Sequence, residues 1–115
     1  MELKRYKDAA PFVYGDLELR ELTPEAFTAA SFAEVVIPVG VDRVPRVSEK
    51  DHRIYVGLVG DIEFTVDGET FHLGPGDVLH VDKGEKYGFH NGGYRDGRLL
   101  LIRVPGPVIP TAAQP

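Results

Sequence analysis

Two side chains of this sequence, Tyr87 and His80, have the chemistry for moving a proton near neutral pH. A phenol can act as an acid and an imidazole as a base, and beside a guanidinium they could polarise a carbonyl group and transfer a proton. Asp82 follows His80 by two residues, so its carboxylate could orient the imidazole through a hydrogen bond. Tyr87 and His80 are therefore the candidate catalytic residues, and plain lining of a pocket is the alternative role for both.

Two arginines, Arg46 and Arg53, are candidates for binding an anion. A guanidinium is costly to bury unless it is paired, and a carboxylate or phosphate can accept two parallel hydrogen bonds from it. The chain also offers its own partners, because Glu49, Asp51 and Asp82 lie nearby in the sequence. The two arginines are thus expected either to hold an anionic group of a ligand or to form structural ion pairs.

Glycines recur around these residues at fixed spacings in two stretches of the chain. In register with Gly-(x5)-His-x-His-(x4)-Glu-(x6)-Gly, the first stretch has Gly40, Arg46, Ser48, Arg53 and Gly60. In register with Gly-(x5)-Pro-x-Gly-(x2)-His-(x3)-Asn, the second stretch has Gly76, Asp82, Gly84, Tyr87 and Asn91. These are the two motifs of the cupin superfamily, which the sequence therefore resembles.

The resemblance implies an all-β fold: a double-stranded β-helix, or jelly-roll barrel, of antiparallel strands, open at one end. It implies the family's pocket without the family's metal. The three histidines and the glutamate that bind metal in cupins are replaced here by Arg46, Ser48, Tyr87 and Arg53. Two guanidiniums at such positions would repel a divalent cation, so no metal and no other cofactor is expected at that place.

The family's ligand positions also indicate which other residues face the pocket, because side chains on a strand alternate between its two faces. The predicted lining is Arg46, Ser48, Arg53, Tyr55, His80, Tyr87 and Phe89. His52 is expected at the rim, while His72 and His90 are expected to point outward. An off-pattern metal site of His52, His80 and His90 is an alternative, since imidazole is the commonest metal ligand, although alternation separates His90 from His80.

The elements that must position these side chains are short strands separated by turns. Strands are predicted at 17–22, 32–39, 53–59, 62–66, 69–73, 78–81, 86–90 and 99–104. Asp67-Gly68 is typical of a two-residue hairpin turn. Only residues 24–30, after the potential cap Thr23, favour a helix, of a turn or two at most. We expect one domain over residues 1–115, with N-terminal strands within 12–22, a core barrel over 32–104 and an extended tail at 105–115.

Composition narrows the setting and the partners. The chain has no cysteine and a formal net charge of -5. Absence of disulfides and thiolates suits a cytoplasmic protein, and no apolar run approaches the ~20 residues of a membrane span. Scattered lysines and arginines form no basic stripe for nucleic acid. We expect a cytoplasmic protein without nucleic-acid or membrane partners, and a homodimer whose interface uses residues 32–39 or the N-terminal strands. The alternative is that the tail from Pro105 onward covers the same surface within one chain.

Three functions are consistent with these features. The first is a small-molecule-binding cupin with a metal-free pocket that favours an anionic organic ligand. The second is a metal-independent isomerase, epimerase, cyclase or lyase that uses Tyr87 and His80, with Arg46 and Arg53 holding the substrate. The third is a metal-dependent enzyme with relocated ligands. The fold by itself does not choose among them, because one barrel can host many chemistries.

Overall fold

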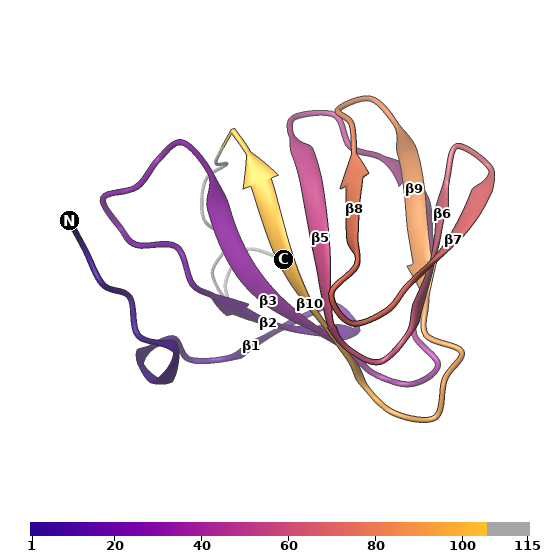
Figure 1. Cartoon of the computed structure of the whole chain (residues 1–115), viewed down its shortest axis with the longest axis horizontal. Coiled ribbons are helices and arrows are strands. Elements are labelled where there is room, and N and C mark those ends of the chain that lie inside the picture. The colour runs from indigo at the N-terminus through magenta and orange to yellow at the C-terminus, as the bar shows by residue number, and fades with distance from the viewer. Residues whose placement is uncertain (106–115) are drawn as a thin grey trace.

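The computed structural model describes residues 1–105, and its regular structure is almost entirely β-strand (Figure 1). The strands are β1 (Phe12–Tyr14), β2 (Leu17–Glu21), β3 (Ser31–Ile37), β4 (Asp42–Val47), β5 (His52–Val59), β6 (Ile62–Val66), β7 (Glu69–Leu73), β8 (Val78–Val81), β9 (Lys86–His90) and β10 (Gly97–Val104). One 3-10 turn, Tyr6–Asp8, precedes them. Within residues 1–105 no helix is long and apolar enough to cross a membrane. The tail predicted at 105–115 lies, from residue 106 on, outside the described residues.

The strands form two antiparallel sheets. One has the order β1-β2-β3-β10-β5-β8 and the other the order β4-β9-β6-β7. The last strand, β10, lies between β3 and β5, so strands far apart in the sequence become neighbours. In Figure 1 the larger sheet fills the left and centre of the molecule, and β9, β6 and β7 close it on the right. The predicted all-β jelly-roll barrel is confirmed.

Alternating burial along the strands explains why the sequence forms these sheets. Along β3, buried and half-buried side chains alternate from end to end, so one face of the strand belongs to the core. All eight predicted strands are present, with ends within two residues of the prediction. The predicted hairpin turn joins β6 to β7, with φ of 46° at Asp67 and 85° at Gly68, the left-handed region that such a turn requires.

Strand β4 was not predicted as a strand, and its irregularity explains why. Pro45 cannot donate a hydrogen bond to a neighbouring strand, so prolines within strands occur at sheet edges and bulges. Here β4 is an edge strand, and its pairing with β9 shifts register between Arg43 and Arg46. The shift brings the β4 backbone so close to Gly88 that a Cβ atom there would overlap the carbonyl oxygen of Arg43. A glycine at position 88 therefore lets β4 pack across β9.

Residues 24–30, the one segment that favoured a helix, form a turn instead. The Phe27 N–H donates to the Pro24 carbonyl at 3.0 Å, and no helix follows. The first N–H groups of this turn are satisfied by Glu2, whose carboxylate accepts hydrogen bonds from the backbone of residues 25 and 26. Thr23 does not cap a helix, because its hydroxyl accepts the Phe32 N–H at 2.7 Å at the start of β3. The prediction of at most one short helix agrees with the described residues, in which the 3-10 turn Tyr6–Asp8 is the only helical element.

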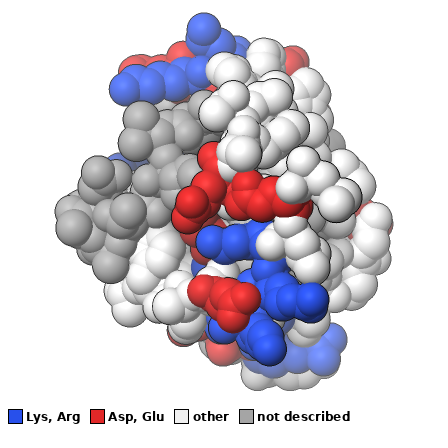
Figure 2. Space-filling view, turned by 90° about the vertical axis from the view of Figure 1, so that its left-hand side faces the viewer, with Lys and Arg blue, Asp and Glu red and all other residues white. Residues whose placement is uncertain are grey.

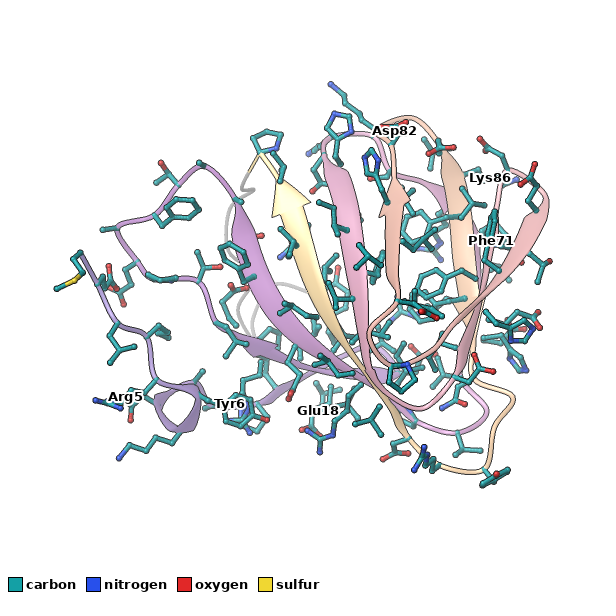
Figure 3. All side chains as sticks on the ribbon, viewed as in Figure 1. Arg5, Tyr6, Glu18, Phe71, Asp82 and Lys86 are labelled. Atoms are coloured by element: carbon teal, nitrogen blue, oxygen red, sulfur yellow. The ribbon has the colours of Figure 1, made fainter. Side chains whose placement is uncertain are left out.

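The core lies between the two sheets, where side chains fill the interior (Figure 3). Ile37, Ile62 and Phe64 are fully buried. The Phe64 ring lies 4.9 Å from the Tyr55 ring and 5.4 Å from the Phe89 ring, measured between centroids. This aromatic cluster is part of the buried core between the two sheets.

Candidate functional site

The barrel contains a cavity of about 130 Å³ beside the aromatic cluster. Its apolar wall includes Phe12, Leu17, Leu19, Val35, Phe89 and Leu101, which come from strands of both sheets. Its polar groups are Glu21, Arg43, Arg53, Tyr55, Tyr87 and Arg103. The cavity thus combines an apolar wall with three guanidiniums and one carboxylate.

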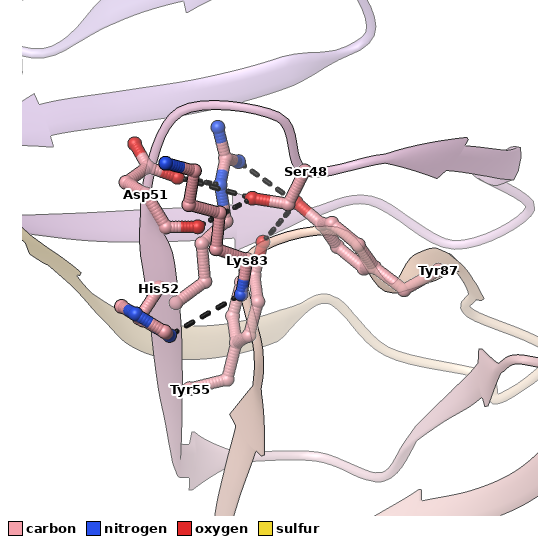
Figure 4. Close-up of polar contacts among 7 residues, drawn as sticks. Ser48, Asp51, His52, Tyr55, Lys83 and Tyr87 are labelled. Carbon is pink, nitrogen blue, oxygen red and sulfur yellow. Dashed lines mark hydrogen bonds and ion pairs between the residues drawn. The ribbon is translucent and has the colours of Figure 1, made fainter.

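Arg53 is held in place by Asp51 and Tyr87, two of the residues labelled in Figure 4. Its Nε donates to Asp51 Oδ1 at 3.1 Å, and the Asp51 side chain is only 6% exposed. Its Nη1 donates to the Tyr87 hydroxyl at 2.8 Å. Ser48 completes the group, because its hydroxyl donates to the Asp51 carbonyl at 2.8 Å. These bonds fix the direction of the guanidinium while using only part of its five N–H donors.

Tyr55 and Tyr87 form a hydrogen-bonded pair of phenols. Their hydroxyl oxygens are 2.9 Å apart, and either can donate. Burial raises the pKa of Tyr55 well above its usual range, and Tyr87 raises this pKa further. The Tyr55 phenol is therefore neutral at physiological pH and acts as a hydrogen-bonding wall group rather than as a base.

Arg103 is the least satisfied charged group of the cavity. Its side chain is 13% exposed, and its nearest carboxylate oxygen, Glu21 Oε2, is 4.0 Å from Nη2. Within residues 1–105, Arg103 Nε and Glu21 Oε2 are both buried without a hydrogen-bond partner. Burial lowers the pKa of Arg103, and the positive charge of Arg53 lowers this pKa further. Two guanidiniums thus face one small volume, with Asp51 and Glu21 as their carboxylate neighbours, but Arg103 makes no close hydrogen bond to either.

Arg43, by contrast, has close hydrogen-bond partners within the chain. Its Nε donates to Asp16 Oδ1 at 2.7 Å and its Nη2 to the Tyr14 carbonyl at 3.2 Å, which ties β4 to the β1–β2 turn. Charges are also mixed on the face shown in Figure 2, where acidic and basic side chains lie next to one another in a central strip. Neighbouring opposite charges weaken each other's field, so a braced pair such as Arg43–Asp16 attracts a ligand less than Arg103 does.

The predicted ligand-binding residues divide between the cavity and an adjoining groove. Arg53, Tyr55 and Phe89 line the cavity together with Tyr87. Arg46 and Ser48 line an adjoining groove of about 350 Å³ that shares Arg53, Tyr87 and Phe89 with the cavity. Arg46 pairs with Tyr87 across β4 and β9, so it faces the same side, but its side chain is exposed at the edge of the sheet.

His80 does not face the cavity, and its predicted inward position is wrong. Directly opposed residues of paired strands share a face, and β8 places His80 opposite Ile54. The next residue along β5, Tyr55, lines the cavity, so Ile54 and His80 lie on the outer face. Asp82 does lie beside the imidazole, with Oδ1 3.1 Å from His80 Nε2, but on this outer surface. His80 and Tyr87 therefore cannot act together on one reacting group.

The off-pattern metal site of His52, His80 and His90 is also wrong as a set. His90 lies on β9 in the other sheet, where its Nδ1 is 3.9 Å from Asp42. In the described part of the chain, the side chains that come together are His52, His80 and Asp82. His72 points outward, as expected, and lies 3.3 Å from Asp61.

The residues at the cupin metal positions do not fit a metal. Guanidinium groups such as those of Arg46 and Arg53 have no lone pair to donate, and their charge opposes a cation. The Ser48 hydroxyl is donated to Asp51, and the Tyr87 hydroxyl already bonds Arg53 and another phenol. These four side chains are therefore unsuited to hold a metal ion.

Sequence reasoning missed Arg103, Arg43 and Glu21. A signal for Arg103 was present, because the alternation along β10 places it on the same face as the buried Leu99 and Leu101. An arginine at an inward position of a hydrophobic strand is unusual and indicates a buried charge. The structure pairs it directly opposite Arg53 across β10 and β5, so the two guanidiniums lie on one face.

Comparison with known families and proteins agrees with this architecture. The model of the family described as Cupin domain matches residues 33–103. A β-D-galactosidase of Mycobacterium tuberculosis is 40% identical over 63 residues, which are 55% of this chain and 53% of that protein. The chain thus spans about half the length of this curated relative.

Solved structures resemble this fold across most of the chain. A predicted oxalate decarboxylase of Thermotoga maritima gives a TM-score of 0.80 at 23% identity and covers 90% of this chain and 99% of its own. The polyketide cyclase RemF of Streptomyces resistomycificus gives a TM-score of 0.80 at 18% sequence identity, and the match covers 96% of this chain and 87% of RemF. KdgF of Halomonas gives a TM-score of 0.81 at 15% sequence identity, and the match covers 94% of this chain and 96% of KdgF. At these identities the likeness shows the fold alone.

Proposed function

The chain belongs to the cupin family, and we propose that it binds a small organic carboxylate inside its barrel, held by Arg53 and Arg103. One observation carries the proposal. Two guanidiniums, on side chains 28% and 13% exposed, lie opposite each other on the inner face of the six-stranded sheet, and Arg103 Nε has no hydrogen-bond partner among residues 1–105. A carboxylate placed between them would accept hydrogen bonds from open donors of both.

The structural ion-pair alternative, raised for Arg46 and Arg53, accounts for Arg53 but does not extend to Arg103. Asp51 holds Arg53 at hydrogen-bonding distance, which is the internal pairing that the sequence allowed. Glu21 is 4.0 Å from Arg103, and its other carboxylate oxygen accepts the Thr23 N–H at 3.2 Å. The Glu21 oxygen that faces Arg103, Oε2, is too distant for a hydrogen bond, so donors of Arg103 stay open to a ligand.

The size and wall of the cavity define the body of the ligand. A cavity of about 150 Å³ lined by apolar side chains is known to hold benzene, so the 130 Å³ here has room for about one ring or a short carbon chain. Leu17, Val35 and Leu101 supply an apolar surface for such a group. A carboxylate with a compact apolar body fits this cavity better than a phosphate, which lacks an apolar part.

No enzymatic activity is part of this proposal. Tyr87 lines the cavity from β9, whereas His80 lies on the outer face of the other sheet, so the two do not form an acid–base pair. Glycoside hydrolysis, which the name of the mycobacterial relative suggests, commonly requires two carboxyl groups flanking one bond. Of the described residues that line the cavity, Glu21 is the only acidic one.

Benzoate and its neutral analogue benzamide test the proposal by thermal unfolding. At a benzoate concentration of about ten times Kd, stability should rise by about 1.4 kcal/mol, which raises Tm by about 4–8 °C in a domain of this size. Benzamide has nearly the same shape but no charge, so it should leave Tm within about 1 °C at the same concentration. Equal stabilisation by benzoate and benzamide would refute an anion site. A protein that neither benzoate nor butyrate stabilises would refute it as well.

A further inference from the structure

A second cluster of chemically capable side chains lies on the outside of the barrel. His52 begins β5, and His80 and Asp82 lie at the end of β8. Arg53 pairs with Val81, so continuing the antiparallel register by one residue places His52 opposite Asp82. Figure 3 shows Asp82 at the upper rim of the barrel, beyond the end of β8. The three side chains therefore share the outer face of neighbouring strands.

We propose that His52, His80 and Asp82 form a binding site for a divalent transition-metal ion of the zinc type. Asp82 Oδ1 is 3.2 Å from His52 Nδ1 and 3.1 Å from His80 Nε2. Ligand atoms about 2.0–2.1 Å from a tetrahedral Zn²⁺ lie about 3.3 Å from one another. The two measured separations match that edge length, and all three ligand atoms lie within 4.8 Å of one another.

The hydrogen bonds of the cluster also indicate a cation. His52 Nδ1 accepts the Lys83 N–H at 3.2 Å, so this nitrogen presents a lone pair. The same lone-pair nitrogen faces a carboxylate oxygen of Asp82 at 3.2 Å, where two acceptors oppose each other. A metal ion between them turns this contact into two bonds, at the loss of one long hydrogen bond from Lys83. Glu85 adds a second carboxylate nearby, accepting the Asp82 N–H at 2.7 Å.

The donor set selects the metal. Two imidazoles and one carboxylate, with water in the remaining position, suit Zn²⁺, Cu²⁺ or Ni²⁺ rather than Mg²⁺ or Ca²⁺, which prefer oxygen ligands alone. The side chains of His52, His80 and Asp82 are 46%, 52% and 59% exposed, so an ion can enter directly from solvent. The bound ion would clamp the start of β5 to the end of β8, next to the segment that carries Asp51 and Arg53.

Calorimetric titration of the untagged protein with Zn²⁺ tests this site. The absorption spectrum of the protein with bound Co²⁺ reports the coordination geometry. We expect one ion per chain. His52→Ala and His80→Ala should each raise Kd by at least about tenfold, since even loss of an outer-shell partner costs about 10–100-fold. Asp82→Asn should also raise the Kd for Zn²⁺.

His72→Ala is the matched control. His72 is also exposed and lies beside two carboxylates, Asp61 at 3.3 Å and Glu63 at 3.6 Å, but among the described residues it belongs to no group of three converging ligand atoms. This variant should bind Zn²⁺ as the unaltered protein does. The proposal is overturned if the unaltered protein shows no saturable binding of Zn²⁺. It is also overturned if His80→Ala binds Zn²⁺ as tightly as the unaltered protein. Benzoate stabilisation should persist in His80→Ala, which separates this site from the cavity.

Discussion

Replacing Arg53 with methionine is expected to lower the free energy of unfolding by about 3–5 kcal/mol and to abolish stabilisation by benzoate. The substitution leaves the buried carboxylate of Asp51 without its cation, with the Ser48 hydroxyl as a remaining donor at 3.1 Å. It also removes the donor that bonds the Tyr87 hydroxyl at 2.8 Å. Breaking a buried pair by removing one partner is costly because the other charge stays desolvated.

Urea unfolding of Arg53→Met, with and without benzoate, measures both effects. Arg98→Met is the matched control, because Arg98, whose side chain is 46% exposed, pairs with the half-buried Glu34 at 3.4 Å on the same sheet. That control should lose less than about 1 kcal/mol and keep its response to benzoate. Adding Asp51→Asn to Arg53→Met should restore part of the lost stability, since it removes the stranded charge. A full benzoate response in Arg53→Met would contradict the assigned role.

Gly88→Ala is expected to destabilise the protein by about 3 kcal/mol or more. The new Cβ would overlap the backbone of β4 at Arg43 and Pro45, and backbone atoms cannot move aside as a flexible side chain can. Because Gly88 lies between Tyr87 and Phe89, moving β4 would also disturb the groove that adjoins the cavity. Thermal and urea unfolding give the size of the loss.

Gly74→Ala provides the comparison for this substitution. At position 74 an added Cβ would make only an ordinary contact, 3.5 Å from Asp77 Oδ2. This variant should therefore change the free energy of unfolding by less than about 1 kcal/mol. Comparable losses in Gly74→Ala and Gly88→Ala would show that close packing of β4 is not what requires glycine at position 88.

Local chemistry allowed much of the fold to be predicted from the sequence. The left-handed turn at Asp67 and Gly68 follows from residue types alone, and the alternation of side chains gives strands such as β6 with correct ends. Strand β4 escaped because Pro45 makes its sequence untypical of a strand, and only its place at a sheet edge makes the proline tolerable.

The candidate site was harder to predict, because it depends on which residues of distant strands oppose each other. Tyr87 and Arg53 follow from the glycine spacings, whereas His80 needed the register between β8 and β5, in which an error of one residue exchanges the two faces. Arg103 was missed although β10 places it opposite Arg53, since β10 meets β5 only through long-range pairing.

A crystal structure of the protein with benzoate tests the central claim most directly. The account predicts the carboxylate between Arg53 and Arg103, with oxygen-to-nitrogen distances of about 2.7–2.9 Å to both guanidiniums, and the ring against Leu17 and Leu101. Benzoate bound outside the barrel, or an empty cavity at a saturating benzoate concentration, would contradict it.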